Sequence, residues 1–204
     1  VDTGMFSPSG AHPSPRLFTF VTAASLLPVK GHRMLLRAFS NLRAKAPDDA
    51  FRWLVVGDGP LRAELTQTAV SSRRLRGYVS FVGEVSHDRL PEVYRSADAF
   101  VLGSLHEAQC MAVLEAMACD LPWIGPRVGA LDDLARLDTD ETPTGMLFSA
   151  RKPDLVGDVL LRMLRADPHQ RGEWGRQARR RVVREYELEE QTDRLVGLLR
   201  ELTG

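Results

Sequence analysis

Residues Ala97–Gly125 read ADAFVLGSLHEAQCMAVLEAMACDLPWIG, and this stretch decides the fold class of the chain. Its first part, Ala97–Ser104, is a short apolar run that predicts a buried strand, while Met111–Ala118 consists mostly of strong helix formers. A second apolar run, Leu121–Gly125, predicts another strand directly after that helix. A strand, a helix and a strand in close succession are typical of a parallel sheet whose strands are joined by crossover helices.

The same alternation continues along the chain from Leu17 onward. We expect strands in LFTFVTAAS, FRWLVVGDGP, YVSFVG, ADAFVLG, LPWIG and TGMLF. We expect helices at 30–46, 61–72, 88–96 and 111–118 and from residue 152 to the end, with breaks near Pro168 and Glu187. In the first helix, one face carries Met34, Leu35, Ala38, Phe39 and Leu42. The pattern predicts the α/β class: a three-layer parallel sheet with helices on both faces and extra C-terminal helices.

Two glutamates flank the turn between the strand and the helix of the opening stretch. Glu107 lies in the turn, and Glu115 is a carboxylate within an otherwise apolar helix. A buried carboxylate needs a hydrogen-bond partner, so we expect Glu115 to bond to the protein or to a ligand. Eight helical residues span about 12 Å and return to nearly the same face. The alternative is a surface Glu107 and a Glu115 that pairs with a nearby arginine.

The helix N-terminus between the two carboxylates presents free N–H groups and the positive end of the helix dipole, which suits an anion. A ligand with hydroxyls at both ends and phosphate in the middle fits this layout. A nucleoside diphosphate sugar is such a ligand.

Two more loops follow predicted strands, at the edge where ligands bind in such sheets. In SLLPVKG (25–31), Lys30 stands at a predicted helix start, where a cation opposes the dipole unless a phosphate lies between them. The alternative is an exposed lysine in a frayed first turn. In GDGP (57–60) the third glycine of a dinucleotide fingerprint is missing, and the chain has no P-loop lysine pattern. A tight turn with Pro60 at the helix start explains this motif.

Composition narrows the class of protein. Of the 204 residues 44% are hydrophobic, a normal proportion for a globular core, and 27 basic residues balance 27 acidic ones. This balance gives no overall field that would draw the chain to nucleic acid or to a membrane. No apolar run reaches transmembrane length and no signal-peptide pattern opens the chain, from which we expect a soluble cytoplasmic protein. Cys110 and Cys119 bracket one predicted helix about 13 Å apart, beyond disulfide reach, and should be reduced thiols.

Taken in order, these motifs resemble the C-terminal, nucleotide-sugar-binding domain of a retaining GT-B glycosyltransferase with an E-x7-E motif, of the glycosyl transferases group 1, family 4 type. The resemblance runs through VDTGMFSP, SLLPVKG, WLVVGDGPLRAEL, VSFVGEVSHDRLPEVYRSADAFVLGS, HEAQCMAVLEAMACDLPWIG and VGALDDLARLDTDETPTGMLF, nearly the whole chain. It implies a Rossmann-like domain that is one half of a GT-B fold.

The resemblance also implies a division of the chain. Residues 1–16, which are rich in Pro, Ser and Gly and do not begin with methionine, would be the linker from an N-terminal acceptor domain absent from this chain. Residues 17–185 would be the donor-binding domain, and 186–204 a C-terminal helix that packs on the absent domain. Such a fragment would bind its donor without turnover by itself.

Individual residues take roles from the same resemblance. Lys30 would contact the donor diphosphate and stabilise it as it departs, and Glu107 would bind hydroxyls of the transferred sugar; these two are the expected catalytic residues. Glu115 would bind the ribose hydroxyls. The other donor contacts would come from Ser25 in the phosphate loop, from the N–H groups of Gln109, Cys110 and Met111, and from Gly83 and Val85 beside the base. The resemblance implies that no metal ion and no other cofactor is needed, in keeping with the absence of a clustered Asp, His or Cys ligand set in the sequence.

The chain departs from the family pattern at three places. Ala24 and Ser25 stand where many members have Gly-Arg, and Ala108, Gln109 and Cys110 replace Gly-Phe-Gly, which adds a side chain where the backbone approaches the sugar. Asp120 replaces a glycine before Leu-Pro. These changes keep open the alternative of a degenerate, non-catalytic nucleotide-binding module. A dinucleotide-dependent oxidoreductase would need a complete glycine fingerprint, which the chain lacks.

Several remaining features have simple interpretations. Four histidines have no evident partner in the sequence and are expected to be structural: His12, His32, His87 and His169. His106, next to Glu107, is either a sugar contact or a solvated loop histidine. Asp132 and Asp133 are expected at a helix start, where N-capping and the dipole favour them.

Two surfaces of the C-terminal region have alternative interpretations. The six arginines between Arg171 and Arg184 form either a surface for anionic membranes or polyanions or, because glutamates are interleaved with them, a solvated helix with i,i+4 pairs. In the absence of the N-terminal domain, five side chains are expected to form an exposed apolar patch or to drive self-association: Tyr186, Leu195, Leu198, Leu199 and Leu202.

Overall fold

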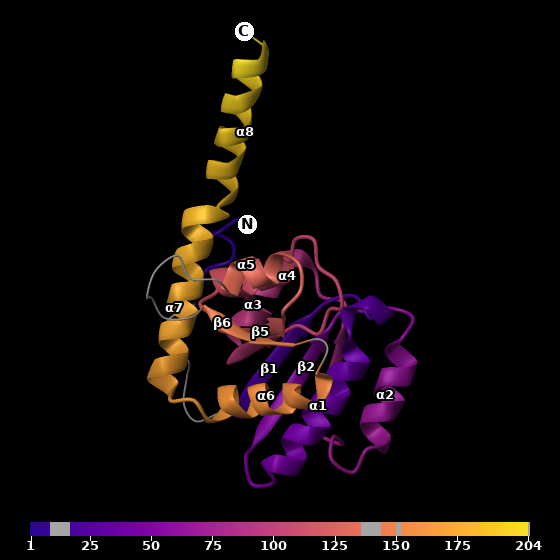
Figure 1. Ribbon diagram of the computed structural model, residues 1–204. Helices are drawn as coiled ribbons and strands as arrows, with labels where there is room; N and C mark the ends of the chain where they lie inside the picture. The colour runs from indigo at the N-terminus through magenta and orange to yellow at the C-terminus, as the bar shows by residue number, and fades with distance from the viewer. Residues whose placement is uncertain (9–16, 136–143, 150–151, 204) are drawn as a thin grey trace.

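The computed structural model describes residues 1–8, 17–135, 144–149 and 152–203. Their centre is a six-stranded sheet with the order β3-β2-β1-β4-β5-β6, in which every pair of neighbouring strands is parallel (Figure 1). The strands are β1 (Phe18–Ala23), β2 (Phe51–Val56), β3 (Val79–Gly83), β4 (Ala99–Val101), β5 (Trp123–Pro126) and β6 (Gly145–Phe148). Each strand lies within a predicted run, except that β5 continues one residue further, to Pro126. The predicted α/β class is confirmed.

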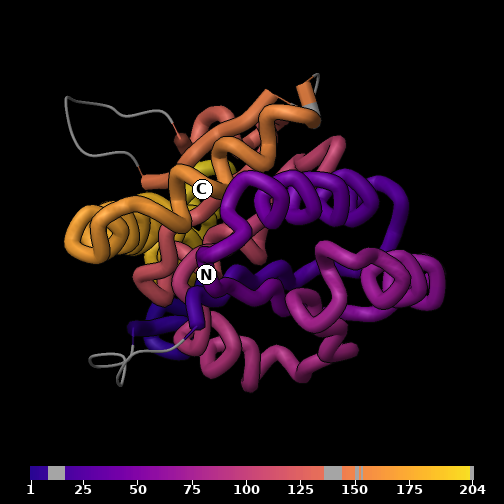
Figure 2. The backbone as a smooth tube through the Cα atoms, turned by 90° about the horizontal axis from the view of Figure 1, so that it is seen from below, coloured from indigo at the N-terminus to yellow at the C-terminus, as the bar shows by residue number. Residues whose placement is uncertain are grey.

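The helices cover both faces of this sheet. They are α1 (His32–Lys45), α2 (Arg62–Ser71), α3 (Leu90–Arg95), α4 (Met111–Ala118), α5 (Ala130–Ala135), α6 (Val156–Arg165), α7 (Pro168–Glu185) and α8 (Leu188–Thr203). Short 3-10 turns precede three of them: η1 (Pro28–Lys30), η2 (His87–Arg89) and η3 (Pro153–Leu155). Buried side chains of α1, α2 and α6, with Trp174 of α7, form one apolar cluster, and those of α3, α4 and α5, with Ala178 and Val182 of α7, form another. Helices α1 and α2 lie side by side (Figure 1, Figure 2).

Aromatic rings fill the cluster under α1. Phe39 stacks on Trp53 of β2 with ring centroids 4.4 Å apart, and its edge meets Phe20 of β1 at 5.2 Å. The predicted apolar face of α1 is confirmed because Leu35, Ala38, Phe39 and Leu42 are fully buried, while Met34 packs partly buried against the same cluster.

The strand order reverses beside β1. The chain runs from β1 outward to β2 and β3, and then returns to the other side of β1 to form β4. In parallel sheets a crevice opens at such a switch point, beyond the carboxyl ends of the strands. The loops that follow β1 and β4, and the helices α1 and α4 that follow them, therefore lie where such a crevice is expected, and this edge of the sheet is called the crevice below.

Close backbone contact joins the C-terminal helices to the domain. A Cβ atom on Gly175 of α7 would lie only 1.9 Å from the carbonyl oxygen of Asp120, so the helix approaches the α4–β5 turn as closely as a glycine permits. Asp120 has a φ of 60°, in the left-handed region that favours glycine, which explains why a glycine is usual at this position.

Helix α8 projects away from the body of the domain (Figure 1). Its leucines are exposed as predicted, with exposed fractions of 57% for Leu195 and 83% for Leu202. The prediction is wrong for Tyr186, which is half-buried against the apolar cluster of α4 and α7. Whether this surface drives self-association stays a prediction.

The first eight residues are attached to the domain by two arginines. Arg95 donates from Nε to the carbonyl oxygen of Ser7 at 2.6 Å, and Arg179 donates to the carbonyl oxygen of Phe6 at 3.1 Å. The Phe6 ring is buried against His87 and Tyr94. The remainder of the predicted linker, including His12, lies outside the described residues.

The arginines of α7 divide into two groups. Arg176 and Arg180 both pair with Glu173, and Arg181 pairs with Glu185 at 3.0 Å, which confirms the interpretation as a helix with ion pairs along its surface. Two arginines do not fit that interpretation. Arg171 donates to the carbonyl oxygen of Ala166 and lies over the Phe18 ring, and Arg179 turns inward and donates to the carbonyl oxygens of Ala118 and Phe6. None of the described helices is long and apolar enough to span a membrane.

The predicted free cysteines and the predicted placement of Asp132 and Asp133 at a helix start are confirmed, while N-capping by either aspartate stays a prediction. Cys110 and Cys119 are free and buried, and burial raises the pKa of each thiol to about 12, so both are protonated at neutral pH. Asp132 and Asp133 lie in the first turn of α5, where Asp132 also accepts from Arg127 at 2.5 Å.

Candidate functional site

Three loops meet at the switch point, and glycines allow them to touch. Gly31, with a φ of 68°, ends the loop after β1, and a Cβ there would lie 1.9 Å from the carbonyl oxygen of Gly103 in the loop after β4. The same two loops share a hydrogen bond from the Leu105 N–H to the Val29 carbonyl at 2.8 Å. In the loop after β5, Gly129 has a φ of 50° and a Cβ there would lie 1.9 Å from the carbonyl oxygen of Glu107. The three loops therefore contact one another through their backbone atoms.

The GDGP turn supports this arrangement from behind. A Cβ on Gly57 would lie 2.2 Å from the carbonyl oxygen of Ala24, and one on Gly59 would lie 2.9 Å from the backbone nitrogen of Leu26. These glycines let the turn touch the loop after β1. The interpretation as a tight turn is confirmed, although α2 begins at Arg62, two residues after Pro60.

Lys30 and Glu107 form an ion pair across the crevice. The Lys30 Nζ atom lies 2.7 Å from Glu107 Oε1, and their side chains are 27% and 7% exposed. Lys30 ends the turn η1 directly before α1, and Glu107 lies in the loop after β4. Both sequence alternatives, a frayed surface lysine and a surface glutamate, are wrong, because residues 77 positions apart form a partly buried, charge-assisted hydrogen bond here.

Helix α4 begins beside this ion pair without a side-chain cap. Gln109, Cys110 and Met111 donate their N–H groups to no acceptor among the residues that the structure describes. The Cys110 side chain belongs to the buried apolar cluster, whereas Met111 is exposed. An uncapped helix N-terminus favours an anion, because its N–H groups and the positive end of the helix dipole have no acceptor among the described residues.

Glu115, further along the same helix, has two hydrogen-bond partners within the protein. Its Oε2 accepts from the Tyr94 hydroxyl at 3.0 Å, and its Oε1 lies 3.0 Å from Nε2 of His87. Burial and the neighbouring Glu115 raise the pKa of Tyr94 well above its usual value, so its hydroxyl keeps the proton that it donates. The expectation that Glu115 has a hydrogen-bond partner is confirmed, with both partners from the protein, and the alternative of an arginine partner is wrong.

His87, which has no evident partner in the sequence and is expected to be structural, has a partner in the structure. Its backbone belongs to η2, between β3 and α3, and its ring reaches Glu115 from the surface. The sequence holds one signal that could have identified it: His87 and Tyr94 are seven residues apart, a spacing that returns to the same side of a helix.

The turn after β3 lies at the same edge of the sheet, because His87, which follows this turn, contacts Glu115. Gly83 adopts a φ of 89°, and Val85 is half-buried at a hollow of about 370 Å³ that Glu84, Ser86 and Arg89 also line. Ser25 is exposed in the loop after β1. The predicted site residues thus come from the loops after β1, β3 and β4.

Two buried polar side chains lie at the same edge of the sheet, His32 at the start of α1 and Ser104 in the loop after β4. His32 and Ser104 have no hydrogen-bond partner for their side chains among the described residues. Burial, and then the charge of Lys30, lower the pKa of His32 to about 4, so its ring is neutral at physiological pH. His106 is exposed next to Glu107.

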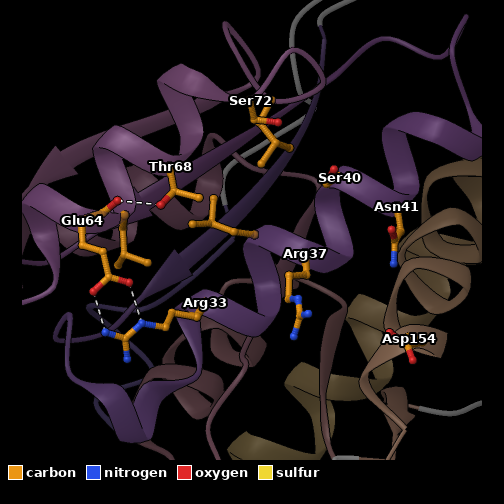
Figure 3. A pocket seen from close by; sticks show the side chains of 11 residues that line it. Arg33, Arg37, Ser40, Asn41, Glu64, Thr68, Ser72 and Asp154 are labelled. Carbon is orange, nitrogen blue, oxygen red and sulfur yellow. Dashed lines mark hydrogen bonds and ion pairs between the residues drawn. The ribbon is translucent and has the colours of Figure 1, made fainter.

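A separate hollow of about 600 Å³ lies between α1 and α2. Figure 3 shows Arg33 and Glu64 facing each other at its edge, joined by hydrogen bonds of 2.6 and 2.5 Å. Neither Lys30 nor the two glutamates of the crevice line it. Within the described ranges, no group of three or more His, Cys, Asp or Glu side chains is arranged to hold a metal ion.

This edge of the Rossmann-like domain carries the Lys30–Glu107 ion pair, the uncapped N-terminus of α4 and the carboxylate of Glu115. Residues 16–166 match the model of the family glycosyl transferases group 1, and the chain belongs to this family. The resemblance seen in the sequence is confirmed.

Individual proteins similar to this chain are glycosyltransferases by name or share its fold. The D-inositol 3-phosphate glycosyltransferase of Rhodococcus jostii is 32% identical over 149 residues, which cover 71% of this chain and 32% of that protein. The GDP-mannose-dependent alpha-mannosyltransferase of Mycobacterium tuberculosis is 31% identical over 190 residues, 90% of this chain and 45% of that protein. The structure of sucrose-phosphate synthase from Thermosynechococcus elongatus superposes with a TM-score of 0.82 at 26% identity, over 100% of this chain and 51% of that chain. The chain thus spans less than half the length of these two curated relatives.

Proposed function

We propose that this chain is the donor-binding half of a retaining GT-B glycosyltransferase and binds a nucleoside diphosphate sugar in the crevice at the switch point. The observation that carries the proposal is the order of groups there: Lys30 paired with Glu107, then the uncapped N-terminus of α4, then Glu115. Membership of the glycosyl transferases group 1 supports it, as does similarity to a relative named as GDP-mannose-dependent.

In this proposal Lys30 and Glu107 are the catalytic residues. A lysine ammonium has three donors, so Lys30 can keep its bond to Glu107 and still donate to a phosphate oxygen. As the bond to the sugar breaks, negative charge grows on the departing diphosphate, and Lys30 together with the α4 dipole stabilises that charge. Since these groups supply the positive charge, we propose that the reaction needs no metal ion and no cofactor.

The other contacts follow from position along the crevice. Glu107 binds hydroxyls of the transferred sugar, and the N–H groups of Gln109, Cys110 and Met111 face the sugar and the phosphates. Glu115 binds the ribose, while Gly83 and Val85 lie against the base and Ser25 lies in the phosphate loop.

The rest of the enzyme would come from an N-terminal domain. We propose that this domain holds the acceptor, that residues 1–16 lead from it, and that the exposed leucines of α8 pack on it. The protein would act in the cytoplasm, without a nucleic-acid partner, and transfer would require both halves.

A degenerate, non-catalytic nucleotide-binding module is the second candidate. The observation that favours it is Cys110, which stands at the start of α4 where the family pattern has glycine. Joined to its N-terminal domain, a degenerate protein would bind nucleotide and show neither donor hydrolysis nor transfer.

Calorimetry with UDP, GDP and ADP tests the proposal on this chain. We expect at least one of them to bind, and Lys30→Gln to lower its affinity roughly tenfold or more, because a charge-assisted hydrogen bond to phosphate is lost. Lys45→Gln is the matched control, since Lys45 is exposed at the other end of α1 and pairs with Asp158. Absence of binding of all three nucleotides at millimolar concentration would overturn the proposal.

A further inference from the structure

We propose that His87 and Tyr94 are positioning residues that hold the Glu115 carboxylate ready for the two ribose hydroxyls, and that Phe6 holds His87 in place. The inference rests on the proposed function, because it concerns the ribose end of the same crevice. It assigns a role to a histidine of the β3–α3 connection and to a phenylalanine of the N-terminal segment.

Both oxygens of Glu115 are already engaged, each by a different side chain. Tyr94 holds Oε2 and His87 holds Oε1, at 3.0 Å in each case. A carboxylate oxygen can accept two hydrogen bonds, so each oxygen retains one position for a ligand hydroxyl. Two oxygens held at fixed positions match the two neighbouring hydroxyls of a ribose, whereas a freely rotating carboxylate would have to be ordered when the ligand binds.

The two partners differ in what keeps them in place. Tyr94 is fully buried, and its neutral hydroxyl donates to Glu115. His87 is 64% exposed, and a contact between such a side chain and a carboxylate contributes little when nothing orders the ring. The tautomer with its proton on Nε2 is the neutral form that can donate to Glu115.

Phe6 supplies the order that His87 lacks. Its ring is 1% exposed, meets the His87 ring edge-on with centroids 5.1 Å apart, and lies 6.1 Å from the Tyr94 ring. One phenyl ring therefore contacts both partners of Glu115.

Phe6 in turn is fixed through its backbone. Arg95 donates to the carbonyl and the hydroxyl oxygens of Ser7 at 2.6 and 2.9 Å, and Arg179 donates to the Phe6 carbonyl at 3.1 Å. Arg95 lies at the end of α3, the helix that carries Tyr94, so the N-terminal segment and the partners of Glu115 form one unit.

The test compares each ribonucleotide with its 2′,3′-dideoxy counterpart. UDP, GDP and ADP and their dideoxy forms are titrated into the parent chain and into His87→Ala, His87→Gln and Tyr94→Phe. In the parent, the ribonucleotide should bind more tightly than its dideoxy form. His87→Ala and Tyr94→Phe should each lower ribonucleotide affinity roughly threefold to tenfold, the loss of one hydrogen bond, and leave dideoxy affinity unchanged.

His87→Gln should recover most of the ribonucleotide affinity, since its amide can donate from a similar position. Phe6→Ala should behave as His87→Ala does. His169→Ala, an exposed histidine on α7, is the control and should change neither affinity.

The outcomes separate the two proposals. If no nucleoside diphosphate binds the parent, the proposed function fails and this inference fails with it. If the parent binds but the variants weaken both forms equally, or the parent does not distinguish the forms, the positioning role alone is overturned. His87 lies at the surface, so its variants decide the matter even if Tyr94→Phe disturbs the fold.

Discussion

Replacing His32 with methionine should make the domain less sensitive to mild acid. His32 is 1% exposed at the start of α1, and its ring nitrogens have no hydrogen-bond partner among the described residues. Burial, with a smaller contribution from the charge of Lys30, lowers its pKa from 6.5 to about 4.

The direction of this change in stability follows from how His32 binds a proton in the folded and in the unfolded chain. The unfolded chain takes up a proton on His32 as the pH falls through 6.5, while the folded chain resists protonation down to about 4. Acid therefore favours unfolding between these two values, and the stability lost through His32 reaches about 2 kcal/mol at a pH of about 5. Below the folded pKa the loss levels off at about 3 kcal/mol.

Urea denaturation followed by circular dichroism, at about pH 7 and about pH 5, measures the effect. The quantity of interest is how much stability each protein loses between the two pH values, because carboxylates elsewhere titrate alike in both and cancel in the comparison. His32→Met should lose about 2 kcal/mol less than the parent. Leu35→Ala, a core change in the same helix, should cost about 2–5 kcal/mol at both pH values and serves as the control. Equal losses in parent and His32→Met, within about 0.5 kcal/mol, would refute the reasoning.

Three further substitutions test the backbone and arginine contacts. Gly129→Ala should lower the melting temperature and weaken nucleotide binding, because its Cβ would collide with a carbonyl oxygen 1.9 Å away, whereas Gly197→Ala, in open space on α8, should be neutral or stabilising by up to about 1 kcal/mol. Asp120→Gly should raise stability by about 1 kcal/mol in thermal unfolding, since it removes a side chain from a left-handed φ of 60°; a clear loss of stability would contradict this. Arg179→Ala should cost about 1–3 kcal/mol in urea titrations because buried carbonyls lose a charged donor, while Arg194→Ala, which breaks an exposed i,i+4 pair, should cost less than about 0.5 kcal/mol.

Local sequence signals are sufficient to predict most helices and strands of the fold. The predicted helix Met111–Ala118 is α4 to the residue, because strong helix formers fill most positions between the turn and Cys119. The strands can be found because the centre of a parallel sheet is buried on both faces, which leaves short continuous apolar runs in the sequence.

The site can be predicted only in part. Spacing alone draws attention to Glu107 and Glu115, and the position of Lys30 before a helix suggests a bound anion. The Lys30–Glu107 pair joins residues 77 positions apart, and such a contact depends on strand order rather than on local pattern. Phe6 falls within a predicted linker because Pro, Ser and Gly surround it, although its ring is buried against His87. Side-chain partners are a property of the tertiary structure, so the sequence indicates the groups but not how they pair.

The glycine contacts beneath the crevice have a consequence for redesign of this domain. Gly31, Gly103 and Gly129 join three loops through main-chain atoms, so the spacing of those loops does not depend on which side chains surround them. Loop grafts or directed-evolution libraries that keep these positions as glycine can vary the residues between Gly83 and His87, or those after Glu107, without altering the frame. Libraries that randomise the glycines themselves will mostly return misassembled domains, whatever ligand they were built to select.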